Sequence, residues 1–529
     1  MKYFHILIFF YLSLNIYSQT IKNNDWQHQD LILNKIPGIS LDKTYNEIIK
    51  NKTGKPIVVA IIDTELDINH EDLKEAIWIN KDEIANNGID DDHNGYVDDI
   101  NGWNFLGNKK GESIVFSNLE SQRILKELSK KKVLLKKDSL LYDKVKKINS
   151  TENENAISIV ERAKKSNEDY IKSLISIKLI YPFGDYNYNK IDSIYNLIKT
   201  KEDQFTKELK ALRYSLKYNL NKDWFENNLE NAINKSKTTY NADFYDRNIT
   251  GDDENNIDDK YYGSNNVSKN SQKVWHSTQV SGIIAARRDN NIGIQGFGNQ
   301  IKIMPIVAVP IGYENDKDIA LAIYYAVDNG AKVINMSFGK DLSMHEDWVK
   351  KAIKYAENKD VLIVHSAGND AKNTNNIPNF PINYIQETNE NFCNNFITVG
   401  GTTSDIEKLV FIGTNYGSHV DILAPSYELY VTDASKGYTI NSGTSLGSAV
   451  VSGAAALIRS HYPKLTAIQV KQIILDSGTA YNLDVIMPGT KDKKVKFSEL
   501  SKSGKVLNVY NAMKMAEELS RKKIKNKKF

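Results

Sequence analysis

Residues 58–64 read VVAIIDT, an apolar run that ends on the carboxylate of Asp63. Such a run is apolar on both faces, as strands buried on both sides of a parallel sheet are. Apolar runs of similar length recur downstream, at residues 301–306, 332–336, 361–364, 396–399 and 420–423. Segments with helical spacing of apolar residues lie between them, at residues 319–328 and 348–357. This alternation predicts an α/β fold with a largely parallel sheet flanked by helices.

Three polar residues stand where chemistry is expected. Asp63 ends its predicted strand, at the edge where ligand sites of open α/β sheets collect. His276 opens the small-residue stretch HSTQVSG, and Ser445 lies in NSGTSLGS, just before an Ala-rich helical pattern. An acid, an imidazole and a hydroxyl in this chain order is one known arrangement of orienting carboxylate, base and nucleophile. The imidazole is needed because a serine hydroxyl is a weak nucleophile until a base takes its proton.

A fourth candidate, Asn369, follows the predicted strand at residues 361–364. An asparagine amide there could donate to a developing oxyanion, a contribution of about 3–4 kcal/mol. Taken singly, each candidate has a structural alternative, with Ser445 as a helix N-cap and Asp63 or Asn369 as turn residues. The candidates together, in this order, favour catalysis.

Residues 108–243 differ from the rest in composition, since they are rich in Lys, Glu, Leu, Ile, Asn and Tyr. Apolar residues at helical spacing predict several amphipathic helices there, with a break near Pro182. Because this stretch separates Asp63 from His276, it is a large helical insertion between the two segments. Its role stays open between a helical appendage packed on the α/β domain and a lid, a partner-binding arm or an inhibitory element. The sequence does not identify its partner.

The ends of the chain predict export and a basic tail. Lys2 precedes the short apolar run ILIFFYL, which fits a signal peptide at residues 1–18 and is shorter than the about 20 residues that span a bilayer. We therefore expect an extracellular, periplasmic or cell-envelope protein without a membrane span in the mature chain. The remaining predicted parts are a short N-terminal segment at 19–50, an α/β domain at 51–107 and 244–515, and a basic tail at 516–529.

The charge balance and the cysteine content bear on the expected partners and on disulfide formation. The chain of 529 residues has 69 Lys and Arg against 66 Asp and Glu, so its formal charge is only +3. This balance gives no general attraction to nucleic acid, which we do not expect as a partner. Cys393 is the single cysteine and cannot form an internal disulfide, so we expect a structural thiol.

The quoted segments resemble those of the subtilisin-like serine peptidase family, the subtilases. VAIIDT at 59–64, HSTQV at 276–280, SAGN at 366–369 and GTS at 443–445 are similar to its aspartate, histidine, oxyanion and serine segments. INMSFG at 334–339 resembles the strand that pairs with the substrate backbone. The resemblance covers roughly residues 53–105 and 244–477, and it does not cover the insertion.

This resemblance implies a subtilisin-like fold and a secreted serine endopeptidase that acts on polypeptides and needs no cofactor for its chemistry. Ser445 would attack the scissile carbonyl, His276 would take and return the proton, and Asp63 would orient His276. Asn369, with the Ser445 backbone N–H, would stabilise the oxyanion. An extended substrate would lie beside the segment of Ser337, Phe338 and Gly339. The residue before the scissile bond would be bordered by the segment of Ser366, Ala367 and Gly368.

Several positions depart from the family pattern. Glu65 stands in place of a glycine, and Ser277 and Gln279 in place of a glycine and a second histidine; Leu446, Gly447 and Ala449 replace the usual Met, Ala and Pro. None of these changes removes a reacting group. They nevertheless leave a second hypothesis, a catalytically silent subtilase fold that binds partners through the helical insertion. A third, an esterase or acyltransferase, has the Gly-x-Ser-x-Gly spacing around Ser445 but the wrong order of base and acid.

The acidic stretch DDDHNGYVDD at residues 90–99 is a candidate metal site. Carboxylates at alternate positions, followed by Asn and Gly, match the opening of an EF-hand loop, although Asn101 stands where the closing Glu would be. Oxygen donors at this spacing suit a structural Ca²⁺ ion, with the candidate ligands Asp90, Asp92, Asn94, Tyr96 and Asp98. A metal-free turn rich in Asp and Asn is the alternative. The second acidic stretch, DDENNIDD at 252–259, is expected to be simply solvated.

Overall fold

The fold is described from a computed structural model. It describes residues 25–50, 52–182, 184, 186–201, 203–218, 220–268, 275–434 and 437–526. The predicted signal peptide therefore lies outside the described residues. The chain forms two compact units: unit 1 comprises the described residues within Met1–Val115, Arg247–Pro310 and Glu314–Phe529, and unit 2 comprises Phe116–Asp246 with Ile311–Tyr313.

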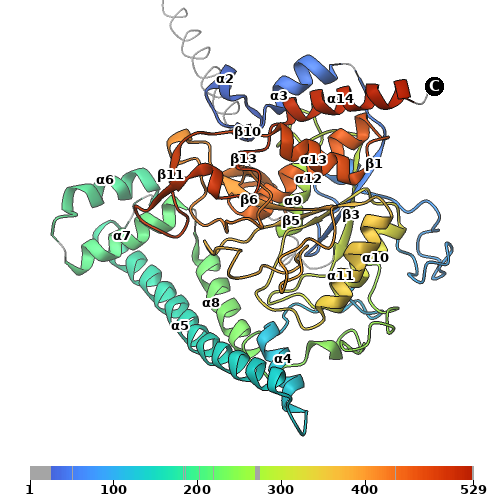
Figure 1. Cartoon of the computed structure of the whole chain (residues 1–529). Helices are drawn as coiled ribbons and strands as arrows, with labels where there is room; N and C mark the ends of the chain where they lie inside the picture. Colours follow the sequence, from blue (N-terminus) through green and yellow to red (C-terminus); the bar gives the residue numbers. More distant parts are fainter. Residues whose placement is uncertain are drawn as a thin grey trace, which may run out of the picture. The chain divides into compact units, whose positions relative to one another are not determined.

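Unit 1 is built on a nine-stranded sheet with the order β10-β13-β7-β6-β5-β4-β1-β3-β2 (Figure 1). Its strands are β1 Ile57–Asp63, β2 Trp103–Asn104, β3 Ile301–Val307, β4 Val333–Met336, β5 Leu362–Ser366, β6 Phe396–Thr402, β7 Ile422–Pro425, β10 Thr479–Ala480 and β13 Lys505–Val506. Neighbouring strands are parallel except for the edge pair β10 and β13. The predicted α/β fold with a largely parallel sheet is confirmed.

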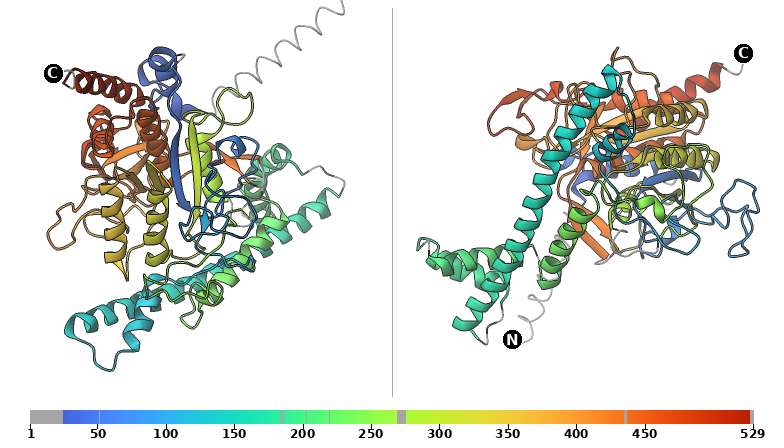
Figure 2. Two further views of the ribbon diagram at one scale, coloured as in Figure 1. Left: turned by 90° about the vertical axis from the view of Figure 1, so that its right-hand side faces the viewer. Right: turned by 90° about the horizontal axis from the view of Figure 1, so that it is seen from below.

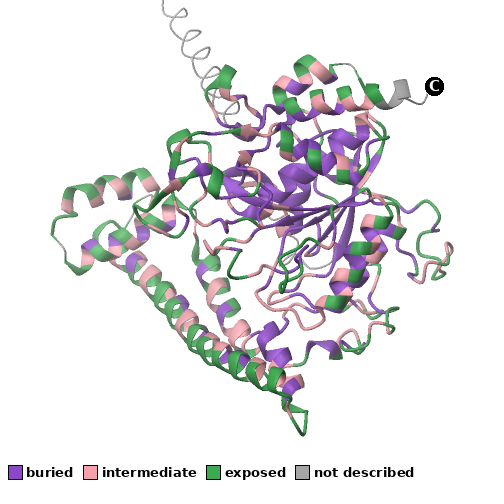
Figure 3. Cartoon of the chain, viewed as in Figure 1, coloured by how far each residue is buried: buried purple, intermediate pink, exposed green. Residues whose placement is uncertain are grey.

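Helices cover both faces of this sheet. One face carries α9 Trp275–Ala285, α12 Thr444–His461, α13 Ala467–Ser477 and α14 Val509–Asn526, and the other carries α10 Asp316–Asp328 and α11 Glu346–Asn358. Strand β1 shows why the sequence requires this. Val59 and Ile61 pack with the first group, whereas Ala60 and Ile62 pack with the second. A strand that is apolar on both faces is thus buried on both faces, as the purple strands of Figure 3 show.

The N-terminal segment joins the same core. Its short helices are η1 Trp26–His28, α2 Leu31–Asn34, α3 Leu41–Thr44 and η2 Tyr45–Ile49. Trp26, Ile39 and Leu41 lie in the apolar cluster of β1 and α12. The remaining elements of unit 1 are η3 Lys74–Ala76, η4 Asp246–Asn248 at its border, η5 Ile406–Lys408, η6 Phe497–Glu499 and two small antiparallel sheets, β8 Leu429–Asp433 with β9 Gly437–Asn441 and β11 Asp484–Ile486 with β12 Lys494–Lys496.

Unit 2 is helical. Its helices are α4 Glu120–Ser129, α5 Lys136–Ile180, α6 Tyr188–Ile198, α7 Gln204–Lys217 and α8 Lys222–Lys237. Helix α5 runs for 45 residues beside α8 and ends just before Pro182, where a break is predicted (Figure 2). Side chains of Asn187, Asp203 and Asn221 cap the starts of α6, α7 and α8. The predicted insertion at 108–243 corresponds to this unit, although residues 108–115 belong to unit 1.

Helix α14 crosses the boundary predicted at residue 515. It continues to Asn526, and Ala512, Met513 and Ala516 are buried in the core of unit 1. Residues 516–526 of the predicted basic tail are therefore part of this helix. In the part of the chain that the structure describes, every helix is too short or too polar to cross a bilayer.

Candidate active site

Strand β1 and helix α9 bring Asp63 and His276 together. Asp63 is the last residue of β1 and its carboxylate is 1% exposed. His276 is the second residue of α9, and its Nδ1 lies 2.7 Å from Asp63 Oδ1, across 213 residues of sequence. The backbone N–H of Thr64 donates to the same oxygen at 2.7 Å. When the Nδ1–H group donates a hydrogen bond to Asp63, the unprotonated Nε2 is the basic atom of the ring.

Burial and charge act in opposite directions on this imidazole. Burial in the protein lowers the pKa of His276, and the negative charge of Asp63 and its hydrogen bond raise it. The two contributions of Asp63 prevail, so the pKa of His276 lies above its ordinary value. A base of this kind is more readily protonated by a neighbouring hydroxyl.

Ser445 lies in the first turn of α12, behind the turn residue Gly443. Gly443 has φ 155°, in the region that favours glycine. The Ser445 hydroxyl donates to the backbone carbonyl of Ser337 at 3.1 Å. The Ser337 hydroxyl in turn donates to the Ser445 carbonyl at 3.2 Å. The hydroxyl at this helix start is thereby held beside the segment that follows β4.

Asn369 lies on the loop after β5, next to the Ser445 turn. Its Oδ1 accepts from the backbone N–H of Thr444 at 2.8 Å and from the Thr444 hydroxyl at 3.1 Å. These bonds orient the amide, so that Nδ2 is its remaining donor group. A Cβ added at Gly443 would lie 3.6 Å from that Nδ2. The structure therefore places an amide donor beside the turn that carries Ser445.

The two predicted substrate segments follow neighbouring parallel strands. Ser337, Phe338 and Gly339 follow β4, and Ser366 ends β5. His365 Nε2 lies 2.8 Å from the Phe338 carbonyl, and burial lowers the pKa of His365 to about 4. The imidazole is therefore neutral and donates to the first segment at neutral pH.

Asn379 links the same two segments and is missed by sequence analysis. Its Nδ2 donates to the Ser366 carbonyl at 3.0 Å, and a Cβ added at Gly339 would collide with its side-chain amide. His365 and Asn379 act through contacts between distant segments, and nothing in the local sequence marks them.

Near the acidic loop at residues 90–99, three carboxylates lie close together. Carboxylate oxygens of Glu83, Asp90 and Asp92 lie within 4.8 Å of one another. Glu83 lies upstream of the predicted loop and was missed. Asp98 instead accepts the backbone N–H groups of Asn87 at 3.0 Å and Gly88 at 2.9 Å.

Two other predicted ligands have structural roles in the same loop. The Asn94 side chain donates to Asp92 at 3.1 Å, and its Oδ1 accepts the Tyr96 backbone N–H at 2.7 Å. The Tyr96 ring is buried against Trp103 and Tyr325. Glu83 and Asp90 accept backbone N–H groups as Asp98 does, so these bonds do not distinguish the clustered carboxylates from Asp98, and the predicted ligand set stays a prediction.

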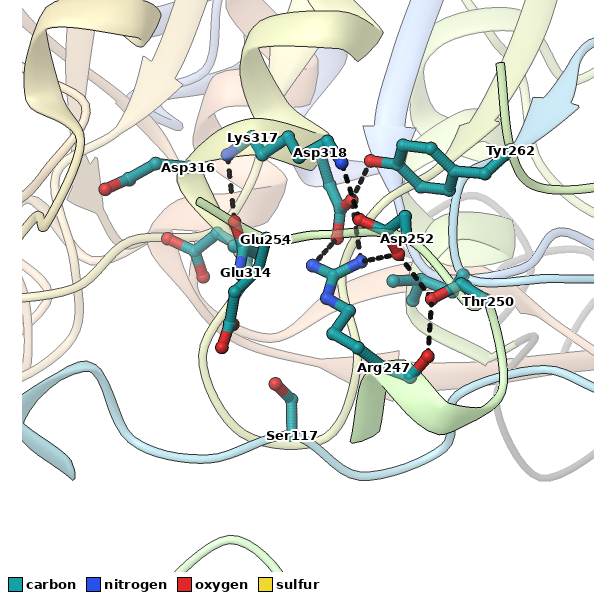
Figure 4. Close-up of polar contacts among 12 residues, drawn as sticks. Ser117, Arg247, Thr250, Asp252, Glu254, Tyr262, Glu314, Asp316, Lys317 and Asp318 are labelled. Atoms are coloured by element: carbon teal, nitrogen blue, oxygen red, sulfur yellow. Dashed lines mark hydrogen bonds and ion pairs between the residues drawn. The ribbon is translucent and has the colours of Figure 1, made fainter. Parts of the chain in front are cut away.

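The second acidic loop is not simply solvated, contrary to expectation. Asp252 is buried and pairs with Lys317 at 2.7 Å (Figure 4). Arg247 pairs with Asp252 at 3.3 Å and with Asp318 at 2.7 Å. The cations supplied by Lys317 and Arg247 allow this burial, because an isolated buried carboxylate would be costly. The partners at 317–318 lie far downstream, so the loop sequence alone cannot reveal them.

Comparison with known proteins identifies the family. The model of the subtilase family, Peptidase_S8, matches residues 54–498. The chain is 37% identical over 186 residues to the thermophilic serine proteinase of Bacillus sp. strain AK1, covering 35% of this chain and 42% of that protein. It is 33% identical over 218 residues to subtilisin DY of Bacillus licheniformis, covering 41% and 74%. It is 34% identical over 186 residues to thermitase of Thermoactinomyces vulgaris, covering 35% and 61%.

These alignments leave parts of the proteins unmatched. The matched region spans less than two thirds of the length of the Bacillus sp. proteinase and of thermitase. The family model, however, extends over most of this chain. The chain therefore belongs to the subtilase family.

Proposed function

We propose that this chain is an exported serine endopeptidase that hydrolyses peptide bonds of proteins through Asp63, His276 and Ser445. The observation that carries the proposal is the 2.7 Å hydrogen bond between His276 Nδ1 and the buried Asp63 carboxylate. A buried carboxylate fixes the tautomer of the imidazole and stabilises its charged form. Membership of the subtilase family supports the same reaction.

In the proposed reaction, His276 Nε2 takes the proton of the Ser445 hydroxyl as the oxygen attacks the scissile carbonyl. The C–O bond forms, the carbonyl oxygen becomes an oxyanion, and the proton is then given to the leaving amine as the C–N bond breaks. Water repeats the sequence on the acyl-enzyme and releases the acid. Asn369 Nδ2 and the Ser445 backbone N–H would donate to the oxyanion.

The substrate would bind as an extended strand. Ser337, Phe338 and Gly339 follow β4 and offer backbone groups for pairing with it. Ser366, Ala367 and Gly368 would border the pocket for the residue before the cut. The bond from His365 to the Phe338 carbonyl supports this arrangement, because it holds the first segment in place.

Hydrolysis of casein by the purified full-length protein, beside Ser445→Ala, tests the proposal. We expect cleavage by the wild type, its loss in Ser445→Ala, and labelling of the wild type alone by a serine-directed fluorophosphonate. A folded wild type that neither cleaves nor reacts would overturn the proposal and favour a binding module. Probe labelling with hydrolysis of small esters but of no peptide would favour an esterase.

A structural Ca²⁺ ion at the acidic loop is part of the proposal. Glu83, Asp90 and Asp92 offer clustered carboxylate oxygens, the donors that Ca²⁺ prefers. Backbone N–H groups of Asn94 and Gly95 already bond to Asp90, so carbonyl groups and water would complete the shell. Thermal unfolding with Ca²⁺ and with chelator tests it: Ca²⁺ should raise the Tm of the wild type and leave the Tm of Asp92→Ala unchanged.

A further inference from the structure

The first two residues after His276, Ser277 and Thr278, are tied to the segment that carries Asp63. The backbone N–H of Ser277 donates to the Thr64 hydroxyl at 3.2 Å. The backbone N–H of Asp67 donates to the Thr278 hydroxyl at 3.0 Å. These two bonds fix the start of helix α9 against the loop that leaves β1, and so support the contact between His276 and Asp63.

The third residue after His276, Gln279, is tied instead to the segment that leads to Ser445. The Asn441 amide donates to Gln279 Oε1 at 2.7 Å. Asn441 is the last residue of β9, and its own Oδ1 accepts the backbone N–H of Ser442 at 2.8 Å. A single side chain therefore connects Gln279 on α9 to the backbone three residues before Ser445.

The position and burial of Gln279 make its hydrogen bond to Asn441 difficult to replace. Gln279 is one helical turn beyond His276, on the same side of α9. It is only 3% exposed, so its amide cannot readily exchange Asn441 for bulk water. The Ser442 hydroxyl also accepts the backbone N–H of Glu428 at 2.8 Å, which fixes the other side of the turn. A change at Gln279 would consequently remove a side-chain link between α9 and a turn that is otherwise held.

We propose that Gln279 and Asn441 are a pair of positioning residues that sets the distance between the His276 imidazole and the Ser445 hydroxyl. The inference rests on the proposed function, since it concerns the same base and nucleophile. Neither side chain is assigned a role in bond making. It also gives a role to one departure from the family pattern, because Gln279 stands where a second histidine is usual.

The pair would affect the rate of the chemical step more than substrate binding. Catalysis depends steeply on the geometry of the reacting groups, and a displacement of about 1 Å costs up to about 100-fold in rate. The substrate segments after β4 and β5 do not contain either residue. Loss of the bond should therefore lower kcat and leave KM nearly unchanged, which is the pattern of an interaction needed in the transition state.

The test compares variants of the full-length protein that differ in this one bond. Gln279→Met keeps the volume of the side chain and removes the acceptor, Gln279→Glu keeps the acceptor, and Asn441→Ala removes the donor. Gln122→Ala in unit 2 is a matched control: Gln122 is also 3% exposed and accepts from the Asn118 amide at 3.2 Å. The measurements are kcat and KM on a peptide substrate, the rate of fluorophosphonate labelling, and Tm.

We expect Gln279→Met and Asn441→Ala each to lower kcat and the labelling rate by about 10- to 100-fold, with KM within about threefold. The double variant should be no slower than the slower single variant, because both remove one bond. Gln279→Glu should recover most of the rate, and Gln122→Ala should keep the wild-type rate.

Two results would overturn the inference alone: a Gln279→Met variant that retains the rate of an active wild type, or single effects that multiply in the double variant. A rate loss that follows Tm equally in all variants, including Gln122→Ala, would also overturn it. A wild type that neither cleaves peptide nor reacts with the probe would instead overturn the proposed function, and this inference with it.

Discussion

Units 1 and 2 bury their apolar side chains in different ways. In unit 1, six of the seven residues of β1 are buried, because helices cover both faces of the sheet. In unit 2, the 45 residues of α5 include six buried ones, spread along one side of the helix. Figure 3 shows the contrast between the purple sheet and the largely green helix.

The two units therefore differ in how firmly they hold their side chains in position. The candidate catalytic residues of unit 1 project from elements that are packed on all sides, which suits chemistry that depends on fixed distances. The long helix α5 of unit 2 buries few of its residues, and exposed positions tolerate substitution. Matched substitutions, one in each unit, test this contrast.

The largest difference is expected for hydroxyl removal. Ser445→Ala in unit 1 should lower kcat by about 10⁶-fold, because the proposed nucleophile is lost. Ser215→Ala in unit 2 removes a buried hydroxyl that donates to the Leu212 carbonyl at 2.8 Å, and should leave kcat within about twofold. Steady-state hydrolysis of one peptide by both variants measures the contrast. Equal activity of Ser445→Ala and wild type would contradict it.

A smaller but clear difference is expected for removal of a lysine charge. Lys317→Met in unit 1 removes the 2.7 Å partner of the buried Asp252 carboxylate, which keeps Arg247 at 3.3 Å as a cation, and should cost about 3 kcal/mol of unfolding free energy. Lys222→Met in unit 2 removes an ion pair with Glu226 whose side chains are 65% and 50% exposed, and should cost less than about 0.5 kcal/mol. Urea unfolding followed by circular dichroism measures both. A Lys317→Met variant as stable as Lys222→Met would show that the buried network is solvated in solution.

Much of unit 1 could be predicted because its signals are local. Apolar runs mark β1, β3, β4, β5, β6 and β7, which lie in the middle of the sheet. The two-residue strands β2, β10 and β13 of this sheet, and the small antiparallel sheets of β8 with β9 and β11 with β12, were not predicted. Asp63 and His276, expected to meet, are joined by a hydrogen bond. The end of α14 was missed because four buried positions, Val509, Ala512, Met513 and Ala516, lie in its first half, whereas lysines dominate the sequence after them.

What the sequence could not supply are contacts between distant segments. Glu83 joins Asp90 and Asp92 only through the folding of the loop between them. The Asn441–Gln279 bond spans 162 residues, and the Lys317–Asp252 pair spans 65. In each case the residue type is common and its spacing carries no pattern, so only the three-dimensional structure reveals the partner.

The pH dependence of stability should have opposite signs in the two units. In unit 1, burial raises the pKa of Asp99 to about 6, although hydrogen bonds from Tyr325 and other side chains oppose the shift. The folded state then holds a proton that the unfolded state releases, so stability falls by about 2 kcal/mol as pH rises from about 4 to 6. In unit 2, hydrogen bonds from Thr206 hold the pKa of Asp203 below its ordinary value. That stabilisation is present above the unfolded pKa and is lost as pH falls below about 4.

Hydrogen exchange measured by mass spectrometry at pH 4 and pH 6 resolves the two units in one experiment, after correction for the intrinsic pH dependence of exchange. Protection around β1 and α10 should decrease from pH 4 to pH 6, whereas protection at the start of α7 should not. A decrease of the same size at the start of α7 would contradict the assignment of opposite signs.

The smallest differences are expected at helix ends, where matched substitutions in the two units should cost nearly the same free energy of unfolding. Thr466 caps α13 in unit 1 by accepting from Gln469 at 3.3 Å, and Asn221 caps α8 in unit 2 by accepting from Trp224 at 2.9 Å. Both caps are exposed and local, so substitution of either by Ala should cost about 1 kcal/mol. The region that loses hydrogen-exchange protection should still differ between the two variants. Because α13 buries Val470 and Ile474 in the core of unit 1, Thr466→Ala should lower protection throughout that unit. Asn221→Ala should lower exchange protection in the first turns of α8 alone. A loss of protection over all of unit 2 would instead show that unit 2 unfolds as cooperatively as unit 1.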